Sequence, residues 1–485
     1  MKPRYFYSSL LLILALFFAT SPAKAELRLP RIFGDNMVLQ RDAQIPIWGW
    51  ADPGQKITVH FAGQEKTATA DPHGRWQLRL DPLPASAEPR PLQIHTAPDN
   101  PPSTLNNVLV GEVWLCSGQS NMEWTVQQSA NPQEEIAAGN HPQIRHIKIA
   151  HVPAATPQDD VTTDGWKTCS PQTVAAFTAV GYYFGRKVHQ ELNVPVGLIG
   201  SNWGGTRIEP WIPPAGFRSV KALKNLADTL DQFPVQKGNK VMHQSALALY
   251  NGMIHPLVPF AIRGALWYQG ESNNGEGMLY HEKMKALING WRTVWKQGDF
   301  PFLFVQLAPF RYGGRRKGNP ANLAENLAEI WEAQRATLAV NNTGMAVTTD
   351  IGNVTDIHPK NKQEVGRRLA LWALAKTYGR QNLEYSGPLY KSHAVEGNAI
   401  RIAFDHADGL KSSNDKPLSH FEIAGEDQKF VPAIATVDGH TILVRGGEHG
   451  VENPVAVRFA WHQEAEPNLV NAAGLPAAPF RTNHQ

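Results

Sequence analysis

Between residues 108 and 379, short apolar runs alternate with longer amphipathic stretches, and this alternation constrains the fold more than any other feature of the chain. Six runs have the length and apolar character of buried strands: 112–116, 144–150, 194–201, 263–268, 302–307 and 345–349. Apolar residues recur every fourth position from Val180 to Leu192, and further helices are expected over 280–295 and 323–338. Such strand–helix alternation predicts a parallel sheet covered by helices on both faces.

The two ends of the chain have the character of β-structure instead. Over 26–106, apolar or alternating runs are separated by turns such as the Asp-Pro-Gly at 52–54, which predicts a small β-sandwich. Short strands surrounded by turn residues return over 381–485. We therefore predict an α/β protein with a central domain over 107–380 and β-sandwich segments at both ends. The sequence leaves open whether the two ends form one module or two.

The first 25 residues have the pattern of a secretory signal peptide. Lys2 and Arg4 precede an uncharged apolar run over 10–19, and Ala23 and Ala25 form a small-x-small cleavage site. An apolar run of ten residues is too short to span a bilayer, which takes about 20. We expect cleavage near Ala25 and a periplasmic or secreted protein with no membrane anchor.

The charge balance excludes one class of partner. The chain has 46 basic and 43 acidic side chains, but three of the basic ones lie within the first 25 residues, so the remainder carries 43 of each sign. No basic excess is left to attract phosphate backbones or anionic lipids, so nucleic acid is not expected as a partner. The two cysteines, Cys116 and Cys169, are too few for a four-thiolate zinc site, and either a disulfide or free thiols remain open.

Common metal and nucleotide motifs are missing from the sequence. It has no His-Glu-x-x-His, no Cys-x-x-Cys, no phosphate-binding loop with its lysine and no Gly-x-Gly-x-x-Gly. Candidate chemistry lies instead in four loops that follow predicted strands, where ligands bind in open parallel sheets.

The first two loops offer a nucleophile and backbone donors. Residues 117–122 (SGQSNM) place Ser120 on a tight strand-to-helix turn, although such a serine is also typical of a helix N-cap. Residues 201–206 (SNWGGT) contain paired glycines that let a backbone N–H approach a ligand, although they would also suit an ordinary connection.

The other two loops offer an amide donor and a base. Residues 269–273 (QGESN) could place the Gln269 amide near a developing oxyanion, or could be a simple polar turn. Residues 350–359 (DIGNVTDIHP) contain His358 with carboxylates close by, ahead of a helix whose start Asn361 and Glu364 are expected to cap. Among the other histidines, His255 is the main rival for the role of base.

The order of these loops resembles that of the SGNH hydrolases, and the motifs most closely resemble the sialate O-acetylesterase family. They are residues 117–122 (SGQSNM), 203–206 (WGGT), 267–273 (WYQGESN) and 356–359 (DIHP). Residues 33–41 and 474–482 also resemble the ends of bacterial members, so the resemblance extends over nearly all of the chain after residue 25.

The resemblance implies a three-layer, flavodoxin-like sheet and an esterase that removes acetyl groups from acetylated sugars without metal or cofactor. It implies Ser120 as nucleophile and His358 as base, with an oxyanion hole formed by the Ser120 N–H, Gly204 or Gly205, and Gln269. The residues expected to border the substrate are Asn121, Trp203, Arg207, Trp267 and Glu271.

One departure from the SGNH pattern concerns the carboxylate that orients the histidine. That carboxylate usually stands three positions before the histidine, where this chain has Thr355. Asp356 is our prediction, Asp350 is the alternative, and a Ser–His dyad remains open. Residues two apart on an extended segment point to opposite faces, so Asp356 can serve only if the chain turns at Ile357.

The substrate is not fixed by the sequence. The family name points to acetylated sialic acid, whereas related architectures act on plant polysaccharides such as xylan or xyloglucan. Trp203, Trp211 and Trp267 could stack on sugar rings or belong to the core. A non-catalytic carbohydrate-binding protein is a further alternative, and the oligomeric state is unknown.

Overall fold

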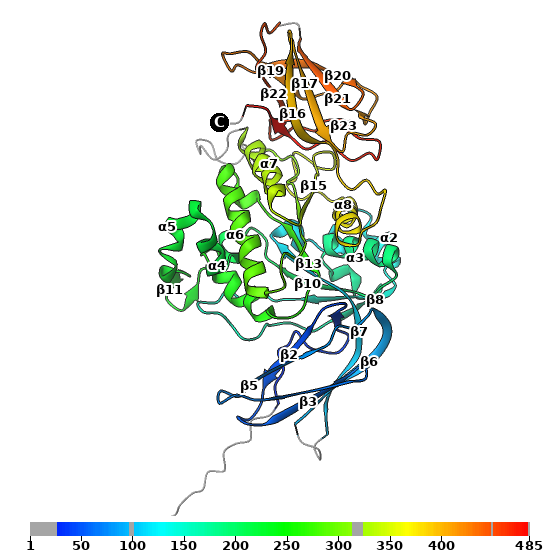
Figure 1. Ribbon diagram of the computed structural model, residues 1–485, viewed down its shortest axis with the longest axis vertical. Helices are drawn as coiled ribbons and strands as arrows, with labels where there is room; N and C mark the ends of the chain where they lie inside the picture. The colour runs from blue at the N-terminus through cyan, green and yellow to red at the C-terminus, as the bar shows by residue number, and fades with distance from the viewer. Residues whose placement is uncertain (1–26, 97–100, 313–323, 448–449, 484–485) are drawn as a thin grey trace, which may run out of the picture.

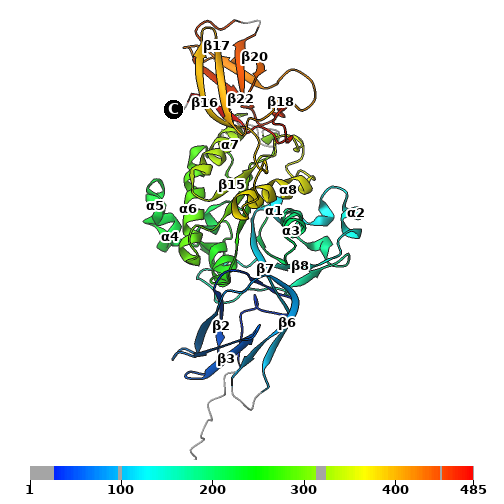
Figure 2. The same cartoon turned by 45° about the vertical axis from the view of Figure 1, so that its right-hand side comes forward.

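The computed structural model describes residues 27–96, 101–312, 324–447 and 450–483, so the predicted signal peptide lies outside the described residues. The molecule is elongated. Its N-terminal and C-terminal β-rich parts lie at opposite ends of a central α/β region (Figure 1; Figure 2). The two ends therefore form two modules rather than one.

The central sheet has six parallel strands and one antiparallel edge strand, which makes it mixed rather than purely parallel. Its order is β15-β14-β13-β7-β10-β8-β9, and only β9 runs against its neighbour. The strands are β7 (Ser103–Gly118), β8 (His141–Lys148), β9 (Lys167–Cys169), β10 (Val196–Asn202), β13 (Gly264–Tyr268), β14 (Phe302–Val305) and β15 (Thr343–Ala346).

Helices cover both faces of this sheet. In both views α4 and α6 lie on one side and α3 and α8 on the other (Figure 1; Figure 2). The helices of this region are α1 (Ser120–Glu123), α2 (Pro132–Ala137), α3 (Ala179–Leu192), α4 (Pro214–Ser219), α5 (Lys224–Ala227), α6 (Met278–Trp295), α7 (Asn326–Ala336) and α8 (Lys362–Trp372).

The predicted elements of the central region are confirmed. Each of the six predicted strands overlaps an observed one, and α3, α6 and α7 lie where the apolar periodicity places them. Half of the predicted cap is present, because the Asn361 side chain accepts a hydrogen bond from the Glu364 backbone N–H at the start of α8. The Glu364 carboxylate accepts instead from Arg367 and Arg368.

The N-terminal part is continuous with the central sheet. Strand β7 runs through the boundary predicted at residue 106, and its first half pairs with β1 and β6 while its second half pairs with β10 and β13. A separate two-stranded ribbon is formed by β2 and β5. The strands here are β1 (Val38–Gln40), β2 (Ile45–Trp50), β3 (Lys56–Phe61), β4 (Gln64–Thr69), β5 (Arg75–Leu80) and β6 (Ser86–His95).

The main sheet of the C-terminal part is one curled antiparallel sheet rather than the predicted sandwich, and β18 (Lys411–Ser412) and β23 (Leu469–Val470) form a separate pair. The order of the main sheet is β16-β17-β21-β20-β19-β22-β24, and the two edge strands approach each other, because Tyr390 of β16 stacks on Phe480 of β24 at 4.9 Å between ring centroids. The strands are β16 (Leu389–Glu396), β17 (Ala399–Asp405), β19 (Phe421–Ala424), β20 (Val431–Asp438), β21 (Thr441–Gly446), β22 (Ala456–Phe459) and β24 (Phe480–Arg481).

Two open questions about the chain have structural answers. Cys116 and Cys169 are both buried free thiols, so no disulfide joins them. Among the described residues, no helix has the length and apolar character to cross a membrane.

Candidate active site

Ser120 lies where the sequence places it, at the turn from the central strand β7 into the short helix α1. The turn depends on Gly118, whose φ of 130° is a conformation that residues with a side chain rarely adopt. A Cβ at this position would also lie 2.1 Å from the Tyr268 carbonyl oxygen. The chain can therefore turn this tightly only with glycine at 118, and the turn leaves the Ser120 side chain partly exposed.

His358 reaches Ser120 from the loop between β15 and α8. Its Nε2 lies 2.9 Å from the Ser120 Oγ, and its ring stacks on Trp124 with 4.8 Å between centroids. Both residues line an open cavity of about 460 Å³, which Glu123 and Lys148 border. A hydroxyl in contact with an imidazole beside an accessible cavity is the arrangement of an activated nucleophile.

The two candidate carboxylates differ in their contacts. Asp356 Oδ1 accepts a hydrogen bond from the His358 backbone N–H at 3.0 Å and lies 3.8 Å from the imidazole Nδ1, which is too long for a hydrogen bond. Asp350 instead forms a bidentate ion pair with Arg368, with both distances 2.7 Å. Asp356 is therefore the carboxylate beside the imidazole, and Asp350 holds helix α8 to its strand.

Gly204 is the glycine that lies against Ser120. A Cβ at this position would lie 3.3 Å from the Ser120 Cβ, whereas one at the exposed Gly205 would meet nothing within 4 Å. The Gly204 N–H donates to Glu123 Oε2 at 2.7 Å. Of the two glycines predicted as backbone donors, Gly204 is thus the one near Ser120, and its N–H already donates to a carboxylate oxygen.

The position of Gln269 does not fit the predicted oxyanion donor. Its side chain is completely buried, and its Nε2 donates to the Thr206 carbonyl at 3.1 Å and to Asn273 Oδ1 at 2.7 Å. Its Oε1 accepts from the Tyr280 hydroxyl. Since both amide hydrogens are engaged inside the protein, Gln269 supports the loop and offers no donor to the cavity.

Asn121 and Glu271 lie beneath the site, joined to a buried lysine. Asn121 Nδ2 donates to Glu271 Oε1 and, at 3.0 Å, to the carbonyl of Ile357, the residue before His358. Lys362 Nζ donates to Asn121 Oδ1. Asn121 and Lys362 are almost wholly buried, so this network holds the histidine loop and is not placed to touch a sugar.

The other predicted substrate residues also have protein partners. Trp267 is 1% exposed and packs on Trp211, so it belongs to the core and cannot stack on a sugar ring. Arg207 forms ion pairs with Glu209 and Glu276.

Trp203 remains partly exposed, but both of its neighbours are stacked imidazoles. Its ring centroid lies 4.4 Å from that of His151 and 4.7 Å from that of His243. The rival base His255 is not part of this cluster, because its Nδ1 contacts the Gln158 carbonyl at 3.0 Å.

A charged cluster close to Ser120 was not predicted. Glu123 contacts His151 Nε2 at 2.8 Å and Lys148 Nζ at 3.4 Å. Burial alone would raise the pKa of the Glu123 carboxyl, but the hydrogen bond to His151 and the Lys148 charge outweigh burial and lower the pKa to about 2. Glu123 stands three residues after Ser120, one helical turn away, which is the sequence signal that could have identified it.

The protonation state of His358 suits a base. Partial burial lowers the pKa of its imidazole below the usual 6.5, and the positive charge of Lys362 lowers it further, although Asp356 opposes this. Burial lowers the pKa of Lys362 itself to about 7. His358 is therefore neutral, and able to accept a proton, over the whole neutral pH range.

Three comparisons relate this chain to carbohydrate acetylesterases. Residues 110–375 match the family of carbohydrate esterases described as sialic acid-specific acetylesterases. The sialate O-acetylesterases of Mus musculus and Homo sapiens are each 30% identical to this chain, over 92% and 93% of its length and 92% of theirs. The crystal structure of a carbohydrate acetylesterase from Xanthomonas citri is 38% identical and has a TM-score of 0.85, covering 95% of this chain and 100% of that one.

Taken with the Ser120–His358 contact, these similarities define the class of the protein, which is a carboxylic ester hydrolase. Within that class, the chain belongs to the sialic acid-specific acetylesterase family of carbohydrate esterases.

Proposed function

We propose that the protein is a serine esterase that removes O-acetyl groups from carbohydrate through an acetyl-enzyme intermediate. The observation that carries the proposal is the 2.9 Å contact between Ser120 Oγ and His358 Nε2 beside an open cavity. A carbohydrate-binding protein without activity would have no use for a neutral imidazole held against a serine hydroxyl.

The chemistry proceeds in two halves. Ser120 Oγ attacks the acetyl carbonyl while His358 Nε2 takes the hydroxyl proton, and the tetrahedral intermediate collapses when the imidazolium returns that proton to the departing sugar oxygen. Water, deprotonated by the same imidazole, then attacks the acetyl-serine, and release of acetate restores the Ser120 hydroxyl.

The negative charge of each tetrahedral intermediate needs donors beside Ser120. The Ser120 N–H, at the first residue of α1, and the Gly204 N–H are the backbone groups in position. Because Gly204 donates to Glu123 in the free protein, we infer that the developing oxyanion replaces the Glu123 oxygen at this N–H. When the Glu123 carboxylate gives up its hydrogen bond from the Gly204 N–H, it still has His151 and Lys148 as partners.

The order of the strands supports an SGNH-type, flavodoxin-like core. Numbered by their order in the chain, the five neighbouring strands β10-β7-β13-β14-β15 give the sequence 2-1-3-4-5. That is the flavodoxin-like order, and its ligands bind where the order reverses, between the first and third strands. Here those strands are β7 and β13, and Ser120 follows the carboxyl end of β7.

For the substrate we propose an acetylated sugar, with polysaccharide acetyl esters as the alternative to acetylated sialic acid. The cavity bordered by Glu123 and Lys148 carries paired charges rather than a free cation for a sialate carboxylate. Rates of acetate release from acetylated sialic acid and from acetylated xylan or xyloglucan oligosaccharides decide between them. We also propose that residues 1–25 direct the protein to the periplasm or outside the cell.

Acetate release by a Ser120→Ala variant tests the mechanism. By analogy with other serine hydrolases we expect a loss on the order of 10⁴-fold or more in kcat, with an unchanged melting temperature. Turnover of p-nitrophenyl acetate by the parent, and its loss after treatment with a serine-directed inhibitor, provide the second measurement. Activity within a few-fold of the parent in the variant would remove Ser120 from the reaction.

A further inference from the structure

The two-stranded ribbon of β2 and β5 carries two partly exposed tryptophans at alternate positions of β2. Along β2, Ile45, Ile47 and Gly49 are buried, whereas Trp48 and Trp50 at alternate positions remain partly exposed. Outward positions of a strand with one buried face are ordinarily polar. Trp48 packs in part against the hydrophobic core, so it is the exposed part of the two indoles that requires a further explanation.

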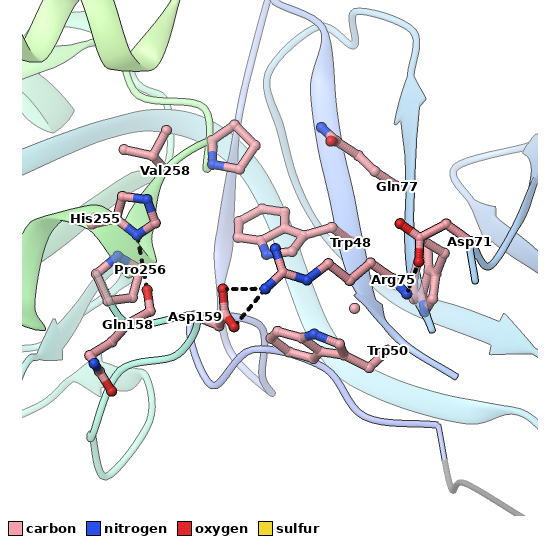
Figure 3. Close-up of a pocket in the computed structure, with 13 residues that line it drawn as sticks. Trp48, Trp50, Asp71, Arg75, Gln77, Gln158, Asp159, His255, Pro256 and Val258 are labelled. Carbon is pink, nitrogen blue, oxygen red and sulfur yellow. Dashed lines mark hydrogen bonds and ion pairs between the residues drawn. The ribbon is translucent and has the colours of Figure 1, made fainter. Parts of the chain in front are cut away.

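These indoles form one wall of a cavity of about 360 Å³, within the range of about 300–1,000 Å³ typical of small-molecule sites. Across the strand pair, Trp48 lies opposite Gln77 and Trp50 lies opposite Arg75. The other wall comes from the central region, which contributes His255 and Pro256 among others (Figure 3). The cavity thus lies between two parts of the molecule, where ligand sites commonly occur.

The two indoles are held in place but not covered. Phe33 packs edge-to-face against Trp48 at 4.6 Å between centroids, and the Arg28 guanidinium lies 3.6 Å from the centre of the Trp50 ring. Both rings still border the cavity and remain partly exposed. A ligand that stacks on them would find platforms whose orientation is already fixed, so little side-chain entropy is lost on binding.

Polar groups of both donor and acceptor type surround these platforms. Arg75 pairs with both oxygens of Asp159 at 2.8 and 3.0 Å, but the two side chains are 59% and 49% exposed, so the pair is weak and can exchange partners. Gln77 is exposed at the same wall. Trp76 also lines the cavity, is 3% exposed, and has an indole N–H with no hydrogen-bond partner in the described part of the chain.

The charges around the cavity cancel, which decides the class of ligand. Three arginines and three aspartates lie in or next to it: Arg28, Arg31, Arg75, Asp71, Asp159 and Asp160. A balanced set gives no net attraction for an anionic sugar, a phosphate or a nucleic acid. Flat aromatic faces next to amide, guanidinium and carboxylate groups instead match a ring with apolar C–H faces and hydroxyl edges. We propose that this cavity binds a neutral oligosaccharide.

Such a site would be separate from the site of ester cleavage. Residues 255–259 of its wall precede β13, whereas Ser120 lies at the carboxyl end of the neighbouring parallel strand. The five residues of β13 alone span about 13 Å, at 3.3 Å for each of the four steps between them. A saccharide bound here leaves the nucleophile free, so this binding goes beyond the proposed function and does not depend on it.

Isothermal titration of the full-length Ser120→Ala chain with xylohexaose and cellohexaose, neither of them acetylated, tests the proposal. We expect one of them to bind and Trp50→Ala to weaken that binding about tenfold, as loss of one stacked ring implies. Trp50→Phe should retain part of the affinity. Arg75→Ala should weaken binding, whereas Arg79→Ala, an exposed change on the same strand outside the cavity, should not.

Three results would overturn the proposal. They are the absence of binding to either hexasaccharide, binding that both Trp50→Ala and Arg75→Ala leave intact, and equal binding of 3′-sialyllactose, which would remove the preference for neutral sugar. If Trp50→Ala fails to fold, the affinities of Arg75→Ala and Trp50→Phe still test whether the ligand binds in this cavity. Since no acetyl group is cleaved in this experiment, its outcome is independent of whether Ser120 is the nucleophile.

Discussion

His358 occupies an environment in which two influences favour its neutral form. Partial burial lowers the pKa of the imidazole, and the ammonium of Lys362, the first residue of α8, lowers it further. Lys362 is itself held by Asn121, which also fixes the Ile357 carbonyl. A single buried network therefore positions the base and adjusts its proton affinity.

Replacing Lys362 by methionine should move the acidic limb of the pH profile of kcat/KM to higher pH. Activity requires neutral His358 and is lost as pH falls through its pKa. Where His358 titrates, below 6.5, Lys362 with a pKa of about 7 is charged, so its removal raises the pKa of the imidazole. Lys360→Met, an exposed change two residues earlier, is the matched control and should leave the profile in place. An unshifted limb in a folded Lys362→Met protein would show that burial alone sets the pKa of His358.

The two aspartates should have separable effects. Asp356 caps the His358 backbone N–H beside the imidazole, so we expect Asp356→Asn to lower kcat about 100-fold, on the scale of general-base contributions, with little change in melting temperature. Asp350 pairs with the buried Arg368, so Asp350→Asn should lower the melting temperature and largely retain kcat. Kinetics and thermal melts of both variants check this. If only Asp350→Asn loses most of its kcat, Asp350 and not Asp356 is the carboxylate that orients His358. If neither variant loses kcat, the site is a Ser–His dyad.

At the level of single residues, sequence motifs predicted the contact between Ser120 and His358 but not what each side chain touches. Trp267 lies within a predicted strand and Gln269 directly follows it, and both have suitable chemistry, yet both point into the protein, and a local motif does not carry that information. Glu123 and Lys148 come from different elements, and their pairing depends on how β7 and β8 lie in the sheet.

Among the elements, the junction between β7 and α1 determines the position of Ser120, the proposed nucleophile. Its geometry depends on Gly118, which is next to the Tyr268 carbonyl of the neighbouring strand β13. Within the junction, the Gln119 N–H donates a hydrogen bond to that same Tyr268 carbonyl at 2.9 Å. Strand pairing and the position of Ser120 are thus coupled through one backbone oxygen.

Gly118→Ala should therefore lower both activity and stability. The added Cβ would lie 2.1 Å from the Tyr268 oxygen, so the turn must shift, and a misplacement of about 1 Å costs on the order of 100-fold in kcat. Gly165→Ala is the control, since it also has a positive φ, of 79°, but meets nothing within 4 Å. It should cost only about 1 kcal/mol of stability and no activity. Measured kcat values and denaturant midpoints of the two variants give the comparison, and equal kcat values would show that the turn tolerates the shift.

The sequence predicted the type of the main central elements but not their continuity. Apolar runs located six strands of the sheet, and helical periodicity located α3, α6, α7 and α8. Strand β7, however, crosses from the N-terminal part into the central sheet without a break, because consecutive residues can pair with different partners while the local pattern stays the same. The curled C-terminal sheet was missed for a related reason, since the approach of Tyr390 to Phe480 joins strands 90 residues apart.

On the scale of the whole molecule, the two β-rich parts are attached in different ways. The N-terminal part shares strand β7 and a continuous hydrophobic core with the central region. The C-terminal part has a core of its own. It meets the central region through Trp461 and Ala478, which belong to the central hydrophobic core, and through ion pairs from Arg481 to Glu332 on α7 and from Arg458 to Glu325. We therefore expect the first two parts to unfold together and the C-terminal part to unfold as a separate unit.

Arg481→Ala should widen the interval between these two unfolding transitions. Arg481 joins both oxygens of the buried Glu332 at 3.0 and 2.8 Å and lies 4.9 Å from the centre of the Trp461 ring, so its loss weakens the attachment of the C-terminal sheet. Differential scanning calorimetry should show the C-terminal transition at lower temperature, while the transition that abolishes esterase activity moves little. Arg401→Ala is the matched control, because its partners Glu396 and Asp438 lie within the same sheet and are largely exposed. If the parent and the Arg481→Ala variant each show a single unfolding transition, the C-terminal sheet and the central region form one cooperative unit.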